Sequence, residues 1–241
     1  MCGRYFRRSD KQQIAEAFRL GLPTTFEILP SYNVAPQTFQ PVVRLNSETG
    51  ERVLTPMRWG LVPFWAKDSK VAFSTINAKA ETLSTSPAFR EAFKRRRCLI
   101  PLDGFYEWQP ISPKMKQPFA VGLASGALFA VAGLWDRWKD KQTGLGLETF
   151  TIITTDPNPL MEPFHNRMPV IVKPEDYERW MAPADPARLP VDLLRSYPEE
   201  EMQAWKVASA VGNVRNDSPE LIAPLESPLL GLAPWHPRGT P

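Results

Sequence analysis

The fold of this chain is decided near its middle by the run Cys98-Leu99-Ile100-Pro101-Leu102-Asp103-Gly104-Phe105-Tyr106-Glu107-Trp108. Its apolar and aromatic residues predict a buried strand over Leu99–Trp108. Similar runs predict further strands at Val42–Leu45, Arg52–Arg58, Phe119–Leu123, Ala127–Leu134, Glu148–Thr155, Met168–Val172 and Trp205–Ser209. The chain is therefore rich in short strands on both sides of this run.

Helices are predicted between these strands. Ser9–Leu20 has a capping-box pattern at Ser9 and Gln12, with Ile14 and Phe18 on one face, and a loop follows through Pro23 and Pro30. Ser86-Pro87 opens a second helix with Phe89 and Phe93 on its buried face, and Pro174–Met181 and a short segment near Leu193 are also predicted as helical. Because no regular βαβ rhythm appears, we expect an α+β fold. It would be a single domain over residues 2–222, with a mainly antiparallel, barrel-like sheet flanked by helices. A proline- and leucine-rich tail over 223–241 is expected to be loosely held.

Composition excludes several classes of protein. The 241 residues are 43% apolar, enough for a substantial core, and the formal net charge of +3 is no argument for nucleic acid by itself. Two cysteines make no disulfide framework and, with one plausible histidine, no metal-binding cluster, so we predict no metal. The sequence has no glycine-rich phosphate loop, Walker motif or dinucleotide fingerprint, so we predict no cofactor. No run has signal-peptide or membrane-spanning character. We expect a soluble, cytoplasmic, monomeric protein without a membrane partner.

Cys2 has a reactivity that Cys98 lacks. If Met1 is removed, Cys2 carries a free α-amine and a thiol on adjacent carbons, with pKa values of about 8 and about 8.5. Such an amine condenses with an aldehyde to an imine, and the sulfur then closes a thiazolidine ring. Cations such as Arg4 are expected to favour the thiolate. Two alternatives stay open: an incidental terminal residue, and an N-terminal-nucleophile hydrolase in which the amine is the base for its own thiol.

Three residues are candidates for proton handling and orientation. Glu107 lies among aromatics, so burial would raise its pKa towards that of a general acid/base, although it could equally be a strand-surface glutamate. His165 precedes a predicted strand, whereas His236 lies in the tail and is expected to be solvated. Asn77 is a neutral donor and acceptor that could orient a reacting group.

Basic and aromatic residues alternate in two segments, Arg4–Arg8 and Arg58–Lys67. Cations can contact phosphates while exposed rings stack on unpaired bases. We expect Trp59, Phe64 and Trp65 to form a partly exposed wedge, the alternative being that they belong to the core. The basic run Lys94–Arg97 is interpreted as a solvated helix end.

Taken together, these segments resemble the SRAP family (SOS-response-associated peptidase) of abasic-site-processing proteins. The resemblance rests on seven short motifs in family order: Met1–Arg4, Tyr32–Pro36, Trp59–Pro63, Ile76–Ala78, Gly104–Trp108, His165–Pro169 and Val211–Val214.

The resemblance implies an SRAP-like fold and a stable crosslink between Cys2 and an abasic site in single-stranded DNA. Asn77 would orient the cysteine and the sugar, Glu107 would act as acid/base for the imine, and His165 would assist ring opening and crosslink reversal. We expect DNA contacts from the following residues: Arg4, Asn33, Pro36, Trp59, Phe64, Trp65, Lys79 and Arg167. Many family members have arginine in place of Lys79, which keeps the charge here but loses a bidentate phosphate contact.

The sequence thus predicts a DNA-damage (SOS) response enzyme that shields abasic sites covalently, with Met1 removed either by self-processing or by a cellular aminopeptidase. The alternatives are an N-terminal-nucleophile cysteine peptidase or amidohydrolase without DNA dependence, and a single-stranded-DNA binding module with no covalent step.

Overall fold

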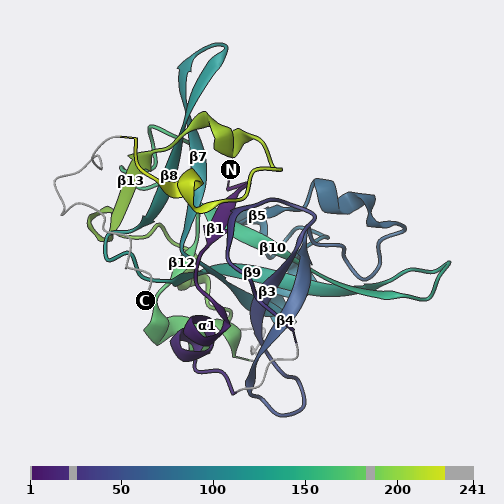
Figure 1. The fold of residues 1–241 in the computed structure, drawn as a ribbon. Coiled ribbons are helices and arrows are strands. Elements are labelled where there is room, and N and C mark those ends of the chain that lie inside the picture. Colours follow the sequence, from purple (N-terminus) through teal and green to yellow (C-terminus); the bar gives the residue numbers. More distant parts are fainter. Residues whose placement is uncertain (1, 22–25, 183–187, 226–241) are drawn as a thin grey trace.

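A computed structural model describes residues 2–21, 26–182 and 188–225 as two β-sheets that pack against each other (Figure 1). One sheet closes into a barrel from β3 (Phe39–Leu45), β4 (Arg52–Trp59), β6 (Arg97–Leu102), β9 (Phe129–Lys139) and β10 (Gly146–Thr155). The order β10-β4-β3-β6-β9 returns to β10, and only the β10–β4 pair in this ring is parallel. The prediction of an α+β fold with a mainly antiparallel, barrel-like sheet is confirmed.

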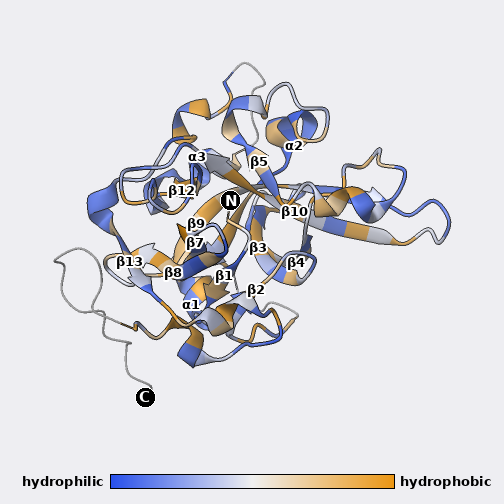
Figure 2. Ribbon diagram, turned by 90° about the horizontal axis from the view of Figure 1, so that it is seen from above, coloured by the Kyte–Doolittle hydropathy of each residue, from blue (hydrophilic) through white to orange (hydrophobic). Residues whose placement is uncertain are grey.

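The second sheet is antiparallel, with the order β13-β8-β7-β1-β2. Its strands are β1 (Tyr5–Arg7), β2 (Ser31–Val34), β7 (Gly104–Ser112), β8 (Met115–Leu123) and β13 (Met202–Lys206). Aromatic side chains join the two sheets, because Tyr5 of β1 packs on Trp59 of β4 at 5.3 Å between ring centroids and Trp59 stacks on Phe150 of β10 at 6.2 Å. In Figure 2 apolar colours run along the strands at the middle of the molecule.

The predicted strand Leu99–Trp108 is two strands in different sheets, and the junction lies at Asp103 and Gly104. The Asp103 carboxylate accepts from the backbone N–H groups of Arg8 and Ser9, both at 2.9 Å, which turns the chain out of the barrel. A Cβ on Gly104 would lie 2.2 Å from the Phe6 ring, so β1 can approach β7 only because this residue is glycine. The apolar pattern could not reveal this change of sheet.

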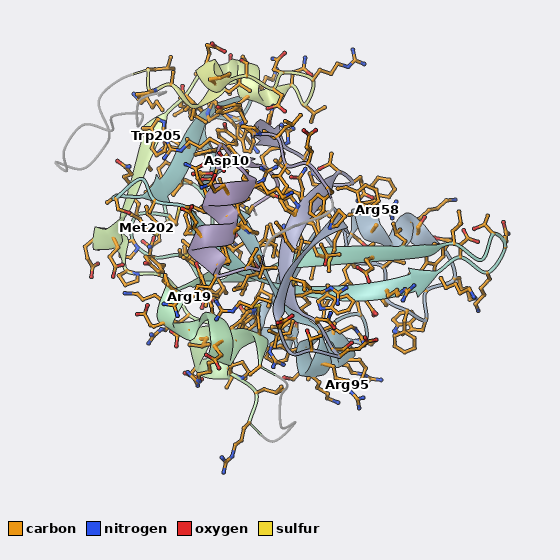
Figure 3. All side chains as sticks on the ribbon, turned by 60° about the horizontal axis from the view of Figure 1, so that its bottom comes forward. Asp10, Arg19, Arg58, Arg95, Met202 and Trp205 are labelled. Carbon is orange, nitrogen blue, oxygen red and sulfur yellow. The ribbon has the colours of Figure 1, made fainter. Side chains whose placement is uncertain are left out.

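The first helix, α1 (Lys11–Phe18), confirms the predicted buried face but not the predicted cap. Ile14 and Phe18 are fully buried, and Phe18 stacks on Tyr177 at 5.0 Å between centroids. The capping box is formed by Asp10 and Gln13, one residue later than predicted, because the Ser9 side chain bonds to Asp103 instead. Figure 3 labels Asp10 and Arg19 at the two ends of this helix.

The second helix is shorter than predicted, since α2 spans Arg90–Arg95 and has no side-chain cap. The interpretation of Lys94–Arg97 as a solvated helix end is wrong for Arg97, which is the first residue of β6 and is buried. Its guanidinium donates to the carbonyls of Phe93 and Trp180, both at 2.6 Å. Backbone acceptors, rather than water, therefore satisfy this charge.

The remaining elements are short. The predicted strand Met168–Val172 is divided into β11 (Met168–Pro169), which pairs with β10, and β12 (Ile171–Val172), which pairs with β9. The predicted helix Pro174–Met181 is a 3-10 turn, Pro174–Asp176, followed by α3 (Tyr177–Met181), and β5 (Asn77–Lys79) adds to β10. The final strand begins at Met202 rather than Trp205.

Some predictions are not tested. Pro23, His236 and residues 226–241 of the expected tail lie outside the described residues, and the domain limits stay a prediction. The helices that the structure describes are all too short or too polar to cross a membrane.

Candidate functional site around the chain end

The two sheets hold the start of the chain between them. Tyr5 pairs with Phe105, and the backbone N–H of Tyr106 donates to the carbonyl of Arg4 at 3.0 Å, so the preceding residues run towards Glu107. On the barrel side, Nδ2 of Asn77 donates to the carbonyl oxygen of Cys2 at 3.0 Å. Cys2 is fully buried in a core cluster to which both sheets contribute. The structure thus brings together three of the predicted catalytic residues: Cys2, Asn77 and Glu107.

Glu107 has the environment expected of a general acid/base. It lies on β7 with only 3% of its surface exposed, and burial raises the pKa of its carboxyl to about 7. At neutral pH the protonated and ionised forms are therefore both populated, so the group can give and take a proton during one reaction. The interpretation of Glu107 as a strand-surface glutamate is wrong.

The Cys2 thiol differs from the expected thiolate. Burial, followed by the negative charge of Glu107, raises the pKa of this thiol well above its ordinary range. The Arg4 guanidinium, expected to favour the thiolate, instead donates to Oδ1 of Asn33 at 2.7 Å and to the carbonyl of Val211 at 3.0 Å. The thiol is therefore protonated at neutral pH, and it must lose its proton to a neighbouring base when the sulfur reacts.

Asn77 combines a used donor with an available acceptor. While its Nδ2 holds the Cys2 carbonyl, its Oδ1 is buried and has no hydrogen-bond partner among the described residues. A buried acceptor without a partner is costly, and it can be satisfied by a donor on a bound molecule. Asn77 can therefore orient both the chain end and a ligand hydroxyl or amine.

His165 lies in the loop between β10 and β11, after Phe164, which packs on Phe119 in the same core cluster as Cys2. Its Nδ1 accepts from the backbone N–H of Arg167 at 3.0 Å, which leaves the proton of the neutral ring on Nε2. Burial, together with nearby positive charges including Lys116, lowers the pKa of this imidazole. The ring is a neutral Nε2–H donor at physiological pH.

Thr154, near the end of β10, is a further candidate site residue that was not predicted from the sequence. Thr154 lies on the same face of β10 as Phe150 and Ile152, which belong to the core cluster of Cys2, and Ile152 pairs with Asn77. Its hydroxyl is buried and has no partner in the described part of the chain. A threonine within an apolar strand gives no sequence signal of its own. It is identified as a polar group on the site face only by its pairing with Lys79, two residues after Asn77 on β5.

Lys79 extends the same face outward. It lies two residues after Asn77 on β5, pairs with Thr154 and is exposed. Because side chains alternate along a strand, Lys79 and Asn77 lie on the same side of the sheet. This placement favours the predicted phosphate contact.

Asn33 is placed differently from its predicted role. It is buried, and its Nδ2 donates to the carbonyls of Asn213 at 3.0 Å and Asn216 at 2.8 Å, while its Oδ1 accepts from Arg4. This geometry does not support a direct DNA contact by Asn33. It supports a role in holding Arg4 against the loop that contains Asn213, with the half-buried Pro36 following β2 nearby in the chain.

Of the three predicted wedge residues, two are exposed. Phe64 and Trp65 have 56% and 51% of their surfaces accessible, as predicted. Trp59 is fully buried, and its indole Nε1 donates to the carbonyl of Ile76 at 2.8 Å, so its prediction as a partly exposed, base-stacking ring is wrong. The reason is its place as the last residue of β4, facing the core between Tyr5 and Phe150.

Arg167 is also engaged inside the protein. Its guanidinium pairs with both carboxylate oxygens of Glu81, with Asp156 at 3.1 Å and with the carbonyl of Thr154 at 2.6 Å. Two carboxylates therefore compete with any phosphate for this charge. The structure favours a role in fixing the loop that carries His165.

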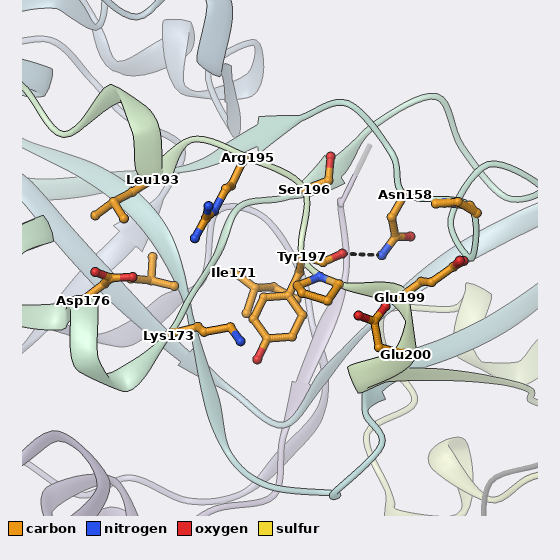
Figure 4. A pocket seen from close by; sticks show the side chains of 13 residues that line it. Asn158, Ile171, Lys173, Asp176, Leu193, Arg195, Ser196, Tyr197, Glu199 and Glu200 are labelled. Atoms are coloured by element: carbon orange, nitrogen blue, oxygen red, sulfur yellow. Dashed lines mark hydrogen bonds between the residues drawn. The ribbon is translucent and has the colours of Figure 1, made fainter.

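A cavity of about 480 Å³ lies elsewhere, between β12 and the segment 193–200 (Figure 4). Its wall includes Asn158, Lys173, Arg195, Tyr197 and Glu199, and none of the predicted site residues lines it. The candidate site is accordingly a buried chain end between two sheets rather than this cavity.

Comparisons with known proteins identify the family of the chain. The family model for SOS response associated peptidase (SRAP) matches residues 1–214. The abasic site processing protein YoqW of Bacillus subtilis is 45% identical over 226 residues, covering 92% of this chain and 99% of that protein. The abasic site processing protein HMCES of Gallus gallus is 33% identical, covering 92% of this chain and 73% of that protein. A crystal structure of a protein from Bacteroides thetaiotaomicron has a TM-score of 0.84 at 26% identity, covering 93% of this chain and all of that one. The chain belongs to the SOS response associated peptidase family.

Proposed function

We propose that this protein captures abasic sites in single-stranded DNA by forming a thiazolidine between Cys2 and the sugar aldehyde, after Met1 has been removed. One observation carries the proposal: Cys2 is the second residue of the chain and is held by Asn77 within the electrostatic reach of a carboxyl whose pKa is near 7. The names of the relatives YoqW and HMCES supply the substrate class, because both are called abasic site processing proteins.

The chemistry proceeds in two balanced steps. The Cys2 amine adds to the aldehyde carbon, and Glu107 donates a proton as the hydroxyl leaves as water, which gives a protonated imine that keeps one hydrogen of the amine. The thiol sulfur then bonds to the carbon of the protonated imine, the ionised Glu107 takes the thiol proton, and the C=N electron pair returns to the nitrogen. One water is released overall and no oxidant is needed. A buried thiol is suited to the second step because it stays protonated until the base beside it acts.

The other site residues have supporting roles in this proposal. The neutral His165, with its proton on Nε2, donates to the sugar ring oxygen as the closed sugar opens to the aldehyde. Oδ1 of Asn77 and the hydroxyl of Thr154 bind hydroxyl groups of the opened sugar. Lys79 and Arg4 attract the backbone phosphates, while Phe64 and Trp65 stack on unpaired bases.

The test is a denaturing gel after incubation with a single-stranded oligonucleotide that carries one abasic site. Wild-type protein is expected to give a heat-stable adduct, whereas Cys2→Ala gives none and the matched control Cys98→Ala gives the wild-type amount. If Cys2→Ala forms as much heat-stable adduct as wild type, the mechanism is wrong. Intact mass before and after reaction reports both the loss of Met1 and the gain of DNA.

A second candidate is an N-terminal-nucleophile peptidase or amidohydrolase, which the family description as a peptidase favours. It predicts an acyl group on the Cys2 sulfur after incubation with an amide substrate and no dependence on DNA. A binding module without covalent chemistry would instead show salt-sensitive DNA binding that is indifferent to abasic sites. Mass spectrometry of the same samples separates the three.

A further inference from the structure

The loop that carries Phe64 and Trp65 is fastened to the barrel at alternate residues. The backbone N–H of Val62 donates to Oγ1 of Thr149 at 2.8 Å, and that of Phe64 donates to Oδ2 of Asp136 at 3.0 Å. Beyond the exposed pair, the carbonyl of Ala66 accepts from Nε1 of Trp138 at 2.9 Å. The three anchors belong to β9 and β10, whose long hairpin extends beside this part of the chain in Figure 1.

Asp136 is the charged member of this set, and it is buried with 4% of its surface exposed. Oδ1 accepts from the backbone N–H of Arg137 at 2.8 Å and forms an ion pair with Nε of Arg96 at 3.2 Å, so Oδ2 is directed to Phe64. Asp136 also pairs with Thr149 across the β9–β10 ladder. Burial raises the pKa of this carboxyl, and Arg96 acts against that increase.

In this arrangement, different residues anchor the loop and present its aromatic rings to solvent. Asp136 and Thr149 hold its backbone inside the protein, while Phe64 and Trp65 project outward with more than half of their surfaces accessible. A loop without the anchors would sample many conformations, and binding would have to order it at a cost in free energy. Loss of the Asp136 carboxylate would also leave the partly buried N–H of Phe64 without its acceptor, and the loop would regain a hydrogen bond to water by moving outward.

We propose that Asp136, oriented by Arg96, is a positioning residue for unpaired DNA, fixing the Phe64–Trp65 loop in the conformation that stacks on bases. The inference rests on the proposed function and adds to it a residue that contacts neither DNA nor the reacting atoms. Asp136 should therefore govern DNA affinity and leave the chemistry at Cys2 unchanged.

The test measures binding of an undamaged single-stranded oligonucleotide by fluorescence anisotropy for Asp136→Ala, Trp65→Ala and the double variant. Stacking of one base on an aromatic side chain is worth about 1–3 kcal/mol, so each single variant is expected to weaken binding by about tenfold. If Asp136 acts through Trp65, the double variant is no more than about twofold weaker than Trp65→Ala. The maximal rate of adduct formation by Asp136→Ala at saturating abasic DNA stays at the wild-type value.

Asp140→Ala is the matched control, because it removes the same charge from the exposed turn between β9 and β10 and no anchor from the loop. Wild-type affinity in Asp136→Ala, or additive effects in the double variant, would overturn the inference. If circular dichroism shows that Asp136→Ala is misfolded, Thr149→Val replaces it, since that change removes the Val62 anchor without altering charge. A wild-type protein that binds DNA but forms no adduct would refute the proposed chemistry and leave this comparison valid.

Discussion

The surroundings of Cys2 and Cys98 are alike in several respects. Both cysteines are free and fully buried, and burial raises the pKa of both thiols. The carbonyl of each accepts a side-chain N–H, from Asn77 for Cys2 and from the indole of Trp180 for Cys98. Neither burial nor a perturbed pKa therefore identifies the reactive cysteine.

The difference lies in the covalent position and in the nearest ionisable group. Cys98 is the second residue of β6, pairs with Gly133 of β9, and has the positive charge of Arg44 as its electrostatic neighbour. Cys2 is beside the start of the chain and has the carboxyl of Glu107, which can accept a proton. An aminothiol with an adjacent base can trap an aldehyde, whereas a thiol on an internal amide cannot form the ring.

The largest expected effect comes from separating the thiol of Cys2 from the amine. A glycine inserted between Met1 and Cys2 leaves both cysteines in the chain but makes the Cys2 nitrogen an amide in the mature protein. We expect complete loss of the heat-stable adduct on a denaturing gel. An insertion after Ser47, in the exposed β3–β4 turn, is the control and should retain the adduct. Persistence of the adduct in the first variant would show that a thiol alone is sufficient.

The second largest effect is expected from replacing Glu107, the proposed base. Glu107→Gln keeps the shape but removes the proton exchange, and general acid/base groups contribute about 10²–10⁴-fold to rates. We expect single-turnover adduct formation to slow by at least about a hundredfold. The wild-type change of rate with pH near 7 should disappear as well. Glu51→Gln, in an exposed turn, serves as the control, and an unchanged pH profile in Glu107→Gln would contradict the assignment.

Cys98→Ser tests whether Cys98 contributes to stability and takes no part in adduct formation. A hydroxyl in the apolar barrel interior loses its hydrogen bonds to water, which costs about 1–3 kcal/mol of unfolding free energy. Urea denaturation should show this loss, while the rate of adduct formation in the folded protein stays at the wild-type value. A large fall in that rate would mean that the two cysteines are not independent.

Glu107 should also make stability depend on pH. Because its pKa is raised on folding, from 4.5 to about 7, the protonated form favours the folded state. The stability contributed by Glu107 is fully present below pH 4.5 and is lost as the pH rises through 7. Glu107→Gln should therefore melt a few degrees above wild type at pH 8 and show almost no difference at pH 4, as measured by thermal denaturation. Equal melting temperatures at pH 8 would contradict the buried, shifted carboxyl.

The smallest effect is expected at Lys79. Arginine at this exposed position keeps the charge and adds a bidentate contact to phosphate, so Lys79→Arg should tighten binding of single-stranded DNA by a few-fold. Anisotropy titrations at two salt concentrations measure this change, and Lys141→Arg in the β9–β10 turn is the control. Weaker binding would place Lys79 away from the DNA backbone.

Periodicity and motif order predicted the strands of the barrel and the apolar face of α1, because these patterns depend on local alternation. The change of sheet at Asp103 and the burial of Trp59 depend on partners far away in sequence, namely Ser9 and Phe150. The same holds for Arg167, whose carboxylate partner Glu81 is 86 residues distant. Thr154 could not be predicted because only the register of β10 with β5 places its hydroxyl on the same face as Asn77.

The place of β1 between β7 and β2 has a consequence for the newly synthesised chain. Tyr5 pairs with Phe105, which is synthesised 100 residues later. At a translation rate of about 5–20 residues per second, roughly 5 to 20 s therefore pass before the β7 partner of Tyr5 exists. Throughout that interval the first residues lack the strand that later encloses them. If the proposed removal of Met1 is carried out by an aminopeptidase, that enzyme has this interval in which to act before β7 pairs with β1. Slow codons between positions 5 and 105 would then raise the fraction of molecules with an unblocked Cys2.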